Sequence, residues 1–243
     1  MEIFLTFEAW VALATLTFLE IVLGIDNIIF ISIITNKLPQ HQQGSARTLG
    51  LAAALIFRIA LLIGITWIIG FSKPLFTVFS FEISGRDLIL GFGGLFLLAK
   101  STSEIHHKIE GENENKTVVK QHGILGIILQ IVALDMIFSF DSILTAIGMT
   151  THLIIMIIAV VISIGIMMLA SGAISRFINN HPTLQMLALS FLILIGFMLI
   201  LESIGIEVPK GYIYFAVFFS LFVELLNMKL SKNKNNQLEE TSQ

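Results

Sequence analysis

Four acidic residues lie within two strongly apolar segments of this chain, where carboxylates are costly. Glu20 and Asp26 belong to the first segment, and Asp135 and Asp141 belong to the second. A carboxylate at the centre of a lipid bilayer costs about 2.5 kcal/mol or more on insertion scales. Such groups need protons, a cationic side chain or a bound cation to offset their charge.

The two acidic pairs share their spacing and their neighbours. A constant shift of 115 residues superposes the first pair on the second, and the same shift places Ser142 on Asn27. The chain has no Cys, and no His lies near the centre of either segment. This all-oxygen donor set suits Mn²⁺, Ca²⁺ or Mg²⁺. The expected ligands of a divalent cation are the four carboxylates and the polar residue after each pair: Glu20, Asp26, Asn27, Asp135, Asp141 and Ser142.

The spacing within each pair predicts a departure from regular helix. Residues six apart on an α-helix point roughly 120° from each other, whereas residues seven apart share a face. A bend or an unwound turn at residues 24–27 and 139–142 would direct both acids of each pair toward one cavity.

The composition places these segments in a membrane. Of the 243 residues, 56% are apolar and 13% are charged, so a soluble globule of this size could not bury its apolar surface. The net charge of -3 argues against a nucleic-acid partner. About 20 apolar residues suffice to cross the hydrocarbon layer as a helix. Seven stretches qualify: residues 8–35, 47–70, 87–104, 123–150, 152–173, 184–203 and 211–228.

The order of the spans predicts an all-α, polytopic membrane protein with an inverted repeat. The acidic motifs lie in the first and fourth spans, so they cross the membrane in opposite directions, and the site is expected near the midplane. Seven transmembrane helices then form two three-helix repeats plus one extra C-terminal helix. The expected units are a first repeat at 1–100, a charged cytoplasmic linker at 101–121, a second repeat at 122–204, a seventh helix at 205–228 and a disordered cytoplasmic tail at 229–243.

The basic residues predict the orientation. Ten Lys and Arg residues fall in the segments of one side and three in those of the other. Because cytoplasmic loops carry the excess of Lys and Arg, we expect a multi-pass protein of the cell (inner) membrane with its N-terminus outside and its C-terminus in the cytoplasm.

Three further charged residues bear on the site. Arg58 lies within the second span, where it either neutralises the empty site in place of the cation or forms a permanent ion pair. Asp87 lies at the outer end of the third span, where it either gates the exit or stabilises the N-terminus of a helix. Glu202, near the end of the sixth span, is expected to extend toward the interface.

The acidic motifs also carry a resemblance to a known family. FLEIVLGIDNIIFIS and LDMIFSFDSILTAIG resemble the two signatures of the TerC family of integral membrane proteins, and the resemblance covers nearly all of residues 8–228. It implies a seven-helix fold within the lysine-exporter superfamily and metal-ion transport, chiefly manganese export. The family's functional positions then fall on the acidic and amide residues of the motifs: Glu20, Asp26, Asn27, Asp135 and Asp141.

Export of a divalent cation from a cell that is negative inside requires an energy source. Two charges cost about 4.6 kcal/mol for each 100 mV. Burial and neighbouring negative charges favour protonation of carboxylates, so we expect exchange of the cation for outside protons. The expected partners are the lipid bilayer, protons and the transported cation, with Mn²⁺ ahead of Ca²⁺ and Mg²⁺ and with no permanently bound cofactor.

Three other functions fit parts of the pattern. A basic amino-acid exporter of the same superfamily would need a cationic partner for the substrate carboxylate, for which Arg58 is the candidate. A membrane partner that supplies metal to secreted proteins would contact the secretion machinery. An intramembrane aspartyl protease shares one proton between two Asp. Residues 23–26 read Leu-Gly-Ile-Asp and lack the first Gly of that enzyme's Gly-x-Gly-Asp signature, so no enzymatic activity is expected.

Overall fold

The computed structural model describes residues 6–64, 69–70, 74–78, 81–110, 123–150, 152–206 and 208–240. Seven helices in this part of the chain are long and apolar enough to cross a membrane, as the sequence predicts. They are α1 (Phe7–Thr35), α2 (Gln40–Ile63), α4 (Gly85–Glu110), α5 (Ile124–Met149), α6 (Leu153–Asn179), α7 (Pro182–Ser203) and α8 (Lys210–Glu240).

Several helices extend beyond the apolar spans, because polar residues can continue a helix outside the hydrocarbon layer. α2 begins directly after Pro39, well before the predicted start of its span, and α4 runs into the predicted linker as far as Glu110. α8 continues to Glu240, so the structure places a helix where the sequence predicts a disordered tail. Good helix formers such as Leu, Lys, Gln and Glu occur along this extension.

A short antiparallel hairpin precedes α4, which the all-α prediction did not include. Its strands are β1 (Pro74–Val78) and β2 (Phe81–Ser84). The segment is apolar but too short to span a membrane as a helix, and its Phe, Thr, Val and Ile residues favour strands. α2 ends at Ile63 with Gly64 as its C-cap, earlier than the predicted end of that span.

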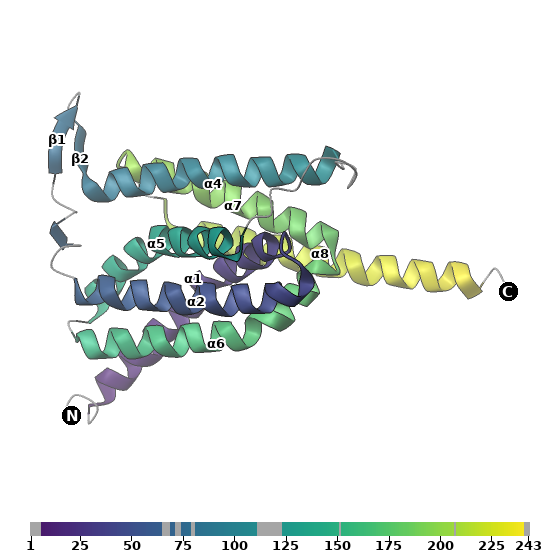
Figure 1. Cartoon of the computed structure of the whole chain (residues 1–243), viewed down its shortest axis with the longest axis horizontal. Helices are drawn as coiled ribbons and strands as arrows, with labels where there is room; N and C mark the ends of the chain where they lie inside the picture. Colours follow the sequence, from purple (N-terminus) through teal and green to yellow (C-terminus); the bar gives the residue numbers. More distant parts are fainter. Residues whose placement is uncertain are drawn as a thin grey trace.

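The helices of the two halves of the chain pack against each other (Figure 1). α1 packs on α6, α2 packs on both α5 and α6, and α4 packs on α7. We call α1, α2, α5 and α6 the core bundle. The α4–α7 pair lies along one side of this bundle with sparser contacts to it, and α8 packs lightly against α7.

The pairing of helices has a two-fold pattern. Exchange of α1 with α5, α2 with α6 and α4 with α7 turns the α1–α6 contact into the α5–α2 contact and leaves the α4–α7 contact unchanged. Such pairing is what two inverted copies of a three-helix unit would produce. The inverted repeat itself stays a prediction.

Two glycines allow the backbones of α4 and α7 to approach closely. A Cβ atom added to Gly94 would lie 2.5 Å from the carbonyl oxygen of Gly196, and one added to Gly196 would lie 2.9 Å from that of Gly94. Small residues at such crossings let membrane helices pack backbone to backbone. This contact fixes α7 beside α4 and so determines which side chains of the two helices meet.

The predicted unwound turns do not occur, because α1 and α5 are continuous α-helices through residues 24–27 and 139–142. A bend within the continuous helices stays a prediction. Gly24 instead makes room for α6, because a Cβ atom there would clash with Sδ of Met167. Ser139 stays helical and donates its hydroxyl to the carbonyl oxygen of Asp135 at 2.5 Å.

Candidate functional site: a charged cavity between the helices

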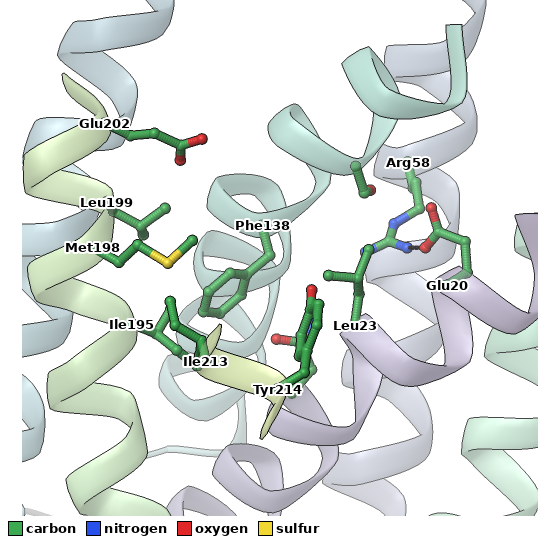
Figure 2. Close-up of a pocket in the computed structure, with 12 residues that line it drawn as sticks. Glu20, Leu23, Arg58, Phe138, Ile195, Met198, Leu199, Glu202, Ile213 and Tyr214 are labelled. Carbon is green, nitrogen blue, oxygen red and sulfur yellow. Dashed lines mark hydrogen bonds and ion pairs between the residues drawn. The ribbon is translucent and has the colours of Figure 1, made fainter. Parts of the chain in front are cut away.

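A cavity of about 70 Å³ lies between the core bundle and the helices α7 and α8. Its polar lining comes from five helices: Glu20 and Asn27 of α1, Arg58 of α2, Ser142 of α5, Glu202 of α7 and Tyr214 of α8. The rest of its wall is largely apolar and includes Phe138 and Met198 (Figure 2). Charged side chains therefore face one another across an apolar space in the interior of a membrane protein.

Arg58 is the centre of the charges in this cavity, and its side chain is only 4% exposed. The guanidinium forms ion pairs with Glu20 and with Asp135, where Nη2 lies 2.8 Å from Oδ1. Its Nε donates a hydrogen bond of 2.9 Å to the hydroxyl oxygen of Ser139. Arg58 thus joins three helices of the core bundle through charged and polar contacts, and its carboxylate partners are two of the predicted cation ligands.

Asp135 has further polar partners. Its Oδ1 accepts a hydrogen bond of 3.5 Å from Nδ2 of Asn27, and its Oδ2 accepts one of 3.0 Å from the Ser139 hydroxyl. A second cavity of about 10 Å³ lies against Asn27 and Asp135, close to the smallest space that holds one water molecule. The Asp135 carboxylate is therefore held in one orientation by fixed donors.

The charges of this cluster do not balance. The described groups are one guanidinium and two carboxylates, so one negative charge is in excess when all three are ionised. Removing charge from water is expensive unless it is paired. A proton or an added cation would offset the excess charge. We call Glu20, Arg58 and Asp135 the interior cluster.

The structure brings five of the predicted residues to this region. Beside the interior cluster lie Asn27 and Ser142; the hydroxyl of Ser142 donates to the carbonyl oxygen of Ser139 at 3.3 Å. The positions of Asp26 and Asp141 fall within α1 and α5, but their side chains lie outside the described part of the structure. The gathering of four carboxylates around one cation therefore stays a prediction.

No group of three or more His, Asp and Glu side chains among the described residues is arranged to hold a metal ion. In the interior cluster the two described carboxylates are occupied by Arg58 instead. Arg58 thus supplies the positive charge of this site. This geometry is compatible with both predicted roles of Arg58, as the counter-charge of an empty cation site and as a partner in a permanent ion pair.

Asp87 lies outside the cavity, at the start of α4. Its Oδ2 accepts hydrogen bonds from the backbone N–H and the hydroxyl of Ser84 at 2.9 and 2.6 Å. In return, the N–H of Asp87 donates to the Ser84 hydroxyl oxygen at 3.2 Å. This reciprocal arrangement is a capping box and explains the acid as a helix-terminal group. A gating role for Asp87 stays a prediction.

Glu202 is a site residue that the sequence reasoning missed. It was expected to extend toward the interface, but it is 9% exposed and its carboxylate points into the cavity from α7 (Figure 2). Its Oε1 accepts a hydrogen bond of 3.4 Å from Nη2 of Arg86. The available signal was the opposite charge of these two residues on the same predicted side of the membrane.

The fold and the site together define a polytopic α-helical membrane protein with a charged cavity between its helices. The chain belongs to the integral membrane protein TerC family, whose sequence pattern matches residues 5–239. This confirms the family expected from the acidic motifs.

Its relatives include bacterial inner membrane proteins. The chain is 59% identical to the UPF0053 inner membrane protein YgdQ of Escherichia coli (strain K12) over 232 residues, which are 95% of this chain and 96% of that protein. It is 52% identical to a UPF0053 protein of Haemophilus influenzae over 229 residues, 93% of this chain and 95% of that protein. It is 47% identical to the inner membrane protein YoaE of Escherichia coli (strain K12) over 234 residues, which are 96% of this chain but 45% of YoaE. No solved structure matches the chain.

Proposed function

We propose that this protein is a membrane transporter that exports divalent metal ions, Mn²⁺ first among them, in exchange for protons. The observation that carries the proposal is the interior cluster, in which Glu20 and Asp135 share the single guanidinium of Arg58. Two buried carboxylates with one fixed cation retain an attraction for further positive charge. The family, the seven spanning helices and the position of the cluster within the helix bundle support transport across a membrane.

In this proposal Arg58 is the resident counter-charge of the empty site. A cation that binds Glu20 and Asp135 must displace the guanidinium, since both seek the same carboxylate oxygens. Asp26 and Asp141 would supply the additional negative charge that a doubly charged ion needs. They follow Glu20 and Asp135 by six residues in α1 and α5. Asn27 and Ser142 would complete the ligands as neutral oxygen donors.

The chemistry of the donors sets the class of cargo. Carboxylate, amide and hydroxyl oxygens suit Mn²⁺, Ca²⁺ and Mg²⁺, whereas copper and zinc sites favour thiolate or imidazole ligands. The chain has no Cys. The choice of Mn²⁺ within this class rests on the resemblance of the acidic motifs to the TerC signatures.

Proton exchange provides the energy that export requires. A carboxylate that loses its cation in a low-dielectric cavity gains from protonation, so protons from outside can replace the departing ion. Alternating access would come from movement of the α4–α7 pair relative to the core bundle, because the cavity lies between α7 and that bundle and the contacts there are sparse. The two-fold pairing of helices supports such a mechanism. The proposed orientation has the N-terminus outside and the C-terminus in the cytoplasm.

The test is Mn²⁺ flux through the full-length protein in lipid vesicles under an imposed pH gradient. Glu20→Gln and Asp135→Asn should each lower the flux about tenfold or more. Glu224→Gln is the matched control, because Glu224 is an acid of α8 that does not line the cavity. Flux that ignores the pH gradient would remove proton coupling. Flux that survives Asp135→Asn would remove the interior cluster from the mechanism.

The described geometry counts against export of a basic amino acid. Arg58, the candidate partner for a substrate carboxylate, already binds two carboxylates of the protein. The cavity of about 70 Å³ suits a small ion and its ligands better than an amino acid. Supply of the exported metal to secreted proteins is compatible with the same transport step, and co-purification of secretion machinery would support it.

A further inference from the structure

The charge pattern of the interior cluster recurs at one end of the bundle. We call this the hairpin end, because β1, β2, the start of α4 and the end of α7 lie there (Figure 1, left). Arg86 faces two carboxylates: Glu202, with Nη2 3.4 Å from Oε1, and Asp87, with Nη1 4.0 Å from Oδ1. One guanidinium again meets two carboxylates.

One carboxylate of each cluster lines the same cavity. Glu20 and Arg58 line one wall, and Glu202 lines the opposite wall with its carboxylate directed inward (Figure 2). Apart from Tyr214 of α8, the described side chains between them, such as Phe138 and Met198, are apolar. An ion that leaves the interior cluster through this cavity therefore crosses a largely apolar gap before it meets the Glu202 carboxylate.

We propose that Glu202 is a second carboxylate station on the transport path, which receives the divalent cation between the interior cluster and the face of the membrane at the hairpin end. This inference rests on the proposed function and adds a residue to it. In the predicted orientation the hairpin end is the outer end, so Glu202 is the exit station.

The two clusters differ in how many carboxylates they offer a cation. The interior cluster holds two, Glu20 and Asp135. At the hairpin end Glu202 lines the cavity, whereas Asp87 caps the start of α4 outside it. The side chains of Glu202 and Asp135 are equally exposed, at 10% each. At similar burial one carboxylate attracts a divalent cation less than two do, so Glu202 holds a cation more weakly than the interior cluster does. A weak carboxylate site beyond the apolar gap lowers the barrier to departure without retaining the ion.

The position of Glu202 in the fold supports the same role. It precedes the last residue of α7, whereas Glu20 and Asp135 lie near the middle of α1 and α5. The close α4–α7 contact at Gly94 and Gly196 fixes α7 beside the helix that carries Arg86. Glu202 is thus placed on a firmly packed helix pair, at the wall that faces the core bundle.

The experiment measures two quantities on the full-length protein: Mn²⁺ flux in lipid vesicles and equilibrium Mn²⁺ binding to purified protein. Glu202→Gln should lower the maximal flux on the order of tenfold and change the binding constant by less than about twofold, because the interior cluster is intact. Glu202→Asp should restore most of the flux. A residue with only a packing role would not show this division between flux and binding or the rescue by a shorter acid.

A second measurement uses the absence of cysteine from the chain. Leu199→Cys introduces a single thiol on the cavity wall about one helical turn before Glu202 and keeps the Glu202 carboxylate. A membrane-impermeant thiol reagent added at the predicted outer face should modify it. Mn²⁺ loaded on the opposite side should slow that modification during transport. Ile204→Cys, at an exposed position beside the outer end of α7 that does not line the cavity, should be modified at a rate that does not depend on Mn²⁺. This measurement does not use the Glu202→Gln variant, so it tests the exit station even if that variant fails to fold.

The outcomes separate this inference from the proposed function. If Asp135→Asn retains full flux, or the unaltered protein carries none, the proposed function fails regardless of Glu202. If Asp135→Asn abolishes flux while Glu202→Gln matches the unaltered protein, transport stands and the exit station is wrong. If Glu202→Gln loses binding as severely as flux, Glu202 belongs to the interior site and a separate station is also wrong.

Discussion

Two charge clusters in this protein combine acidic and basic side chains in opposite proportions. In the interior cluster, one guanidinium is shared by two carboxylates, which leaves one negative charge in excess. Near the opposite end of α4 from the hairpin, one carboxylate, Glu104, is shared by two ammonium groups, which leaves one positive charge in excess. The interior cluster can accept a further cation, and the Glu104 cluster repels one.

The Glu104 cluster links helices through ion pairs. Glu104 forms an ion pair with Lys37, in the turn after α1, and another with Lys100 of α4 at 3.1 Å. It thereby joins the core bundle to the α4–α7 pair at one end, whereas the cavity lies between α7 and the core bundle. Burial of a carboxylate is therefore not enough to indicate a transport site; the ratio of acids to bases around it is the better guide.

The largest effect is expected from removal of the interior counter-charge. Arg58→Gln leaves Glu20 and Asp135 facing each other without a cation, and loss of one partner from a buried ion pair costs about 3–5 kcal/mol. The free energy of unfolding in detergent should fall by about that amount. Glu224→Gln is the control and should leave it unchanged. An Arg58→Gln variant as stable as the unaltered protein would mean that the carboxylates do not depend on Arg58.

The next effect is a change in how Mn²⁺ stabilises the protein. In Arg58→Gln the cation no longer competes with a guanidinium for Glu20 and Asp135, so it should bind more tightly than in the unaltered protein. A ligand at a hundred times its dissociation constant adds about 2.7 kcal/mol to stability. The thermal midpoint of the variant should therefore rise with Mn²⁺ more steeply than that of the unaltered protein. An equal or smaller rise would contradict the proposed competition.

A smaller effect on stability is expected from a change in the Glu104 cluster. Glu104→Gln leaves Lys37 and Lys100, whose side chains are 31% and 22% exposed and can be hydrated. The free energy of unfolding should fall by about 1 kcal/mol, the upper range for exposed ion pairs. Equilibrium Mn²⁺ binding should be unchanged. Loss of binding in this variant would show that the ratio of acids to bases does not separate the two clusters.

The fold and part of the site were predictable because they depend on local sequence. Seven apolar stretches of sufficient length give seven spanning helices. Arg58 was expected to act as counter-charge to an empty site or to form an ion pair, because a charged group within a span needs a partner. The structure places Arg58 against Glu20 and Asp135. Its need for an acidic partner could be predicted from its place within a span, without knowledge of the helix packing.

The remaining features depend on tertiary contacts that no local pattern reveals. Gly24 was interpreted as part of a bend or an unwound turn, but it lies in continuous helix and accommodates Met167 of α6. Glu202 was expected to face the interface, and it turns inward because Gly94 and Gly196 hold α7 close to α4, which carries Arg86. The local sequence around Gly24 is the same whether the glycine permits a turn or a close helix contact. The local sequence around Glu202 is the same whether its side chain faces the interface or the interior. In both cases the neighbouring helix determines the outcome.

The smallest effect should come from Lys37→Gln, and its dependence on salt makes it informative. Glu104 keeps Lys100 as a partner, so the loss should be about 0.5 kcal/mol or less. Because Lys37 is partly exposed, added salt should screen its contribution and bring the variant and the unaltered protein together. The deficit of Arg58→Gln should persist in the same titration, since its charges are buried. If salt removes both deficits equally, the interior cluster is open to solvent and the contrast between the two clusters is lost.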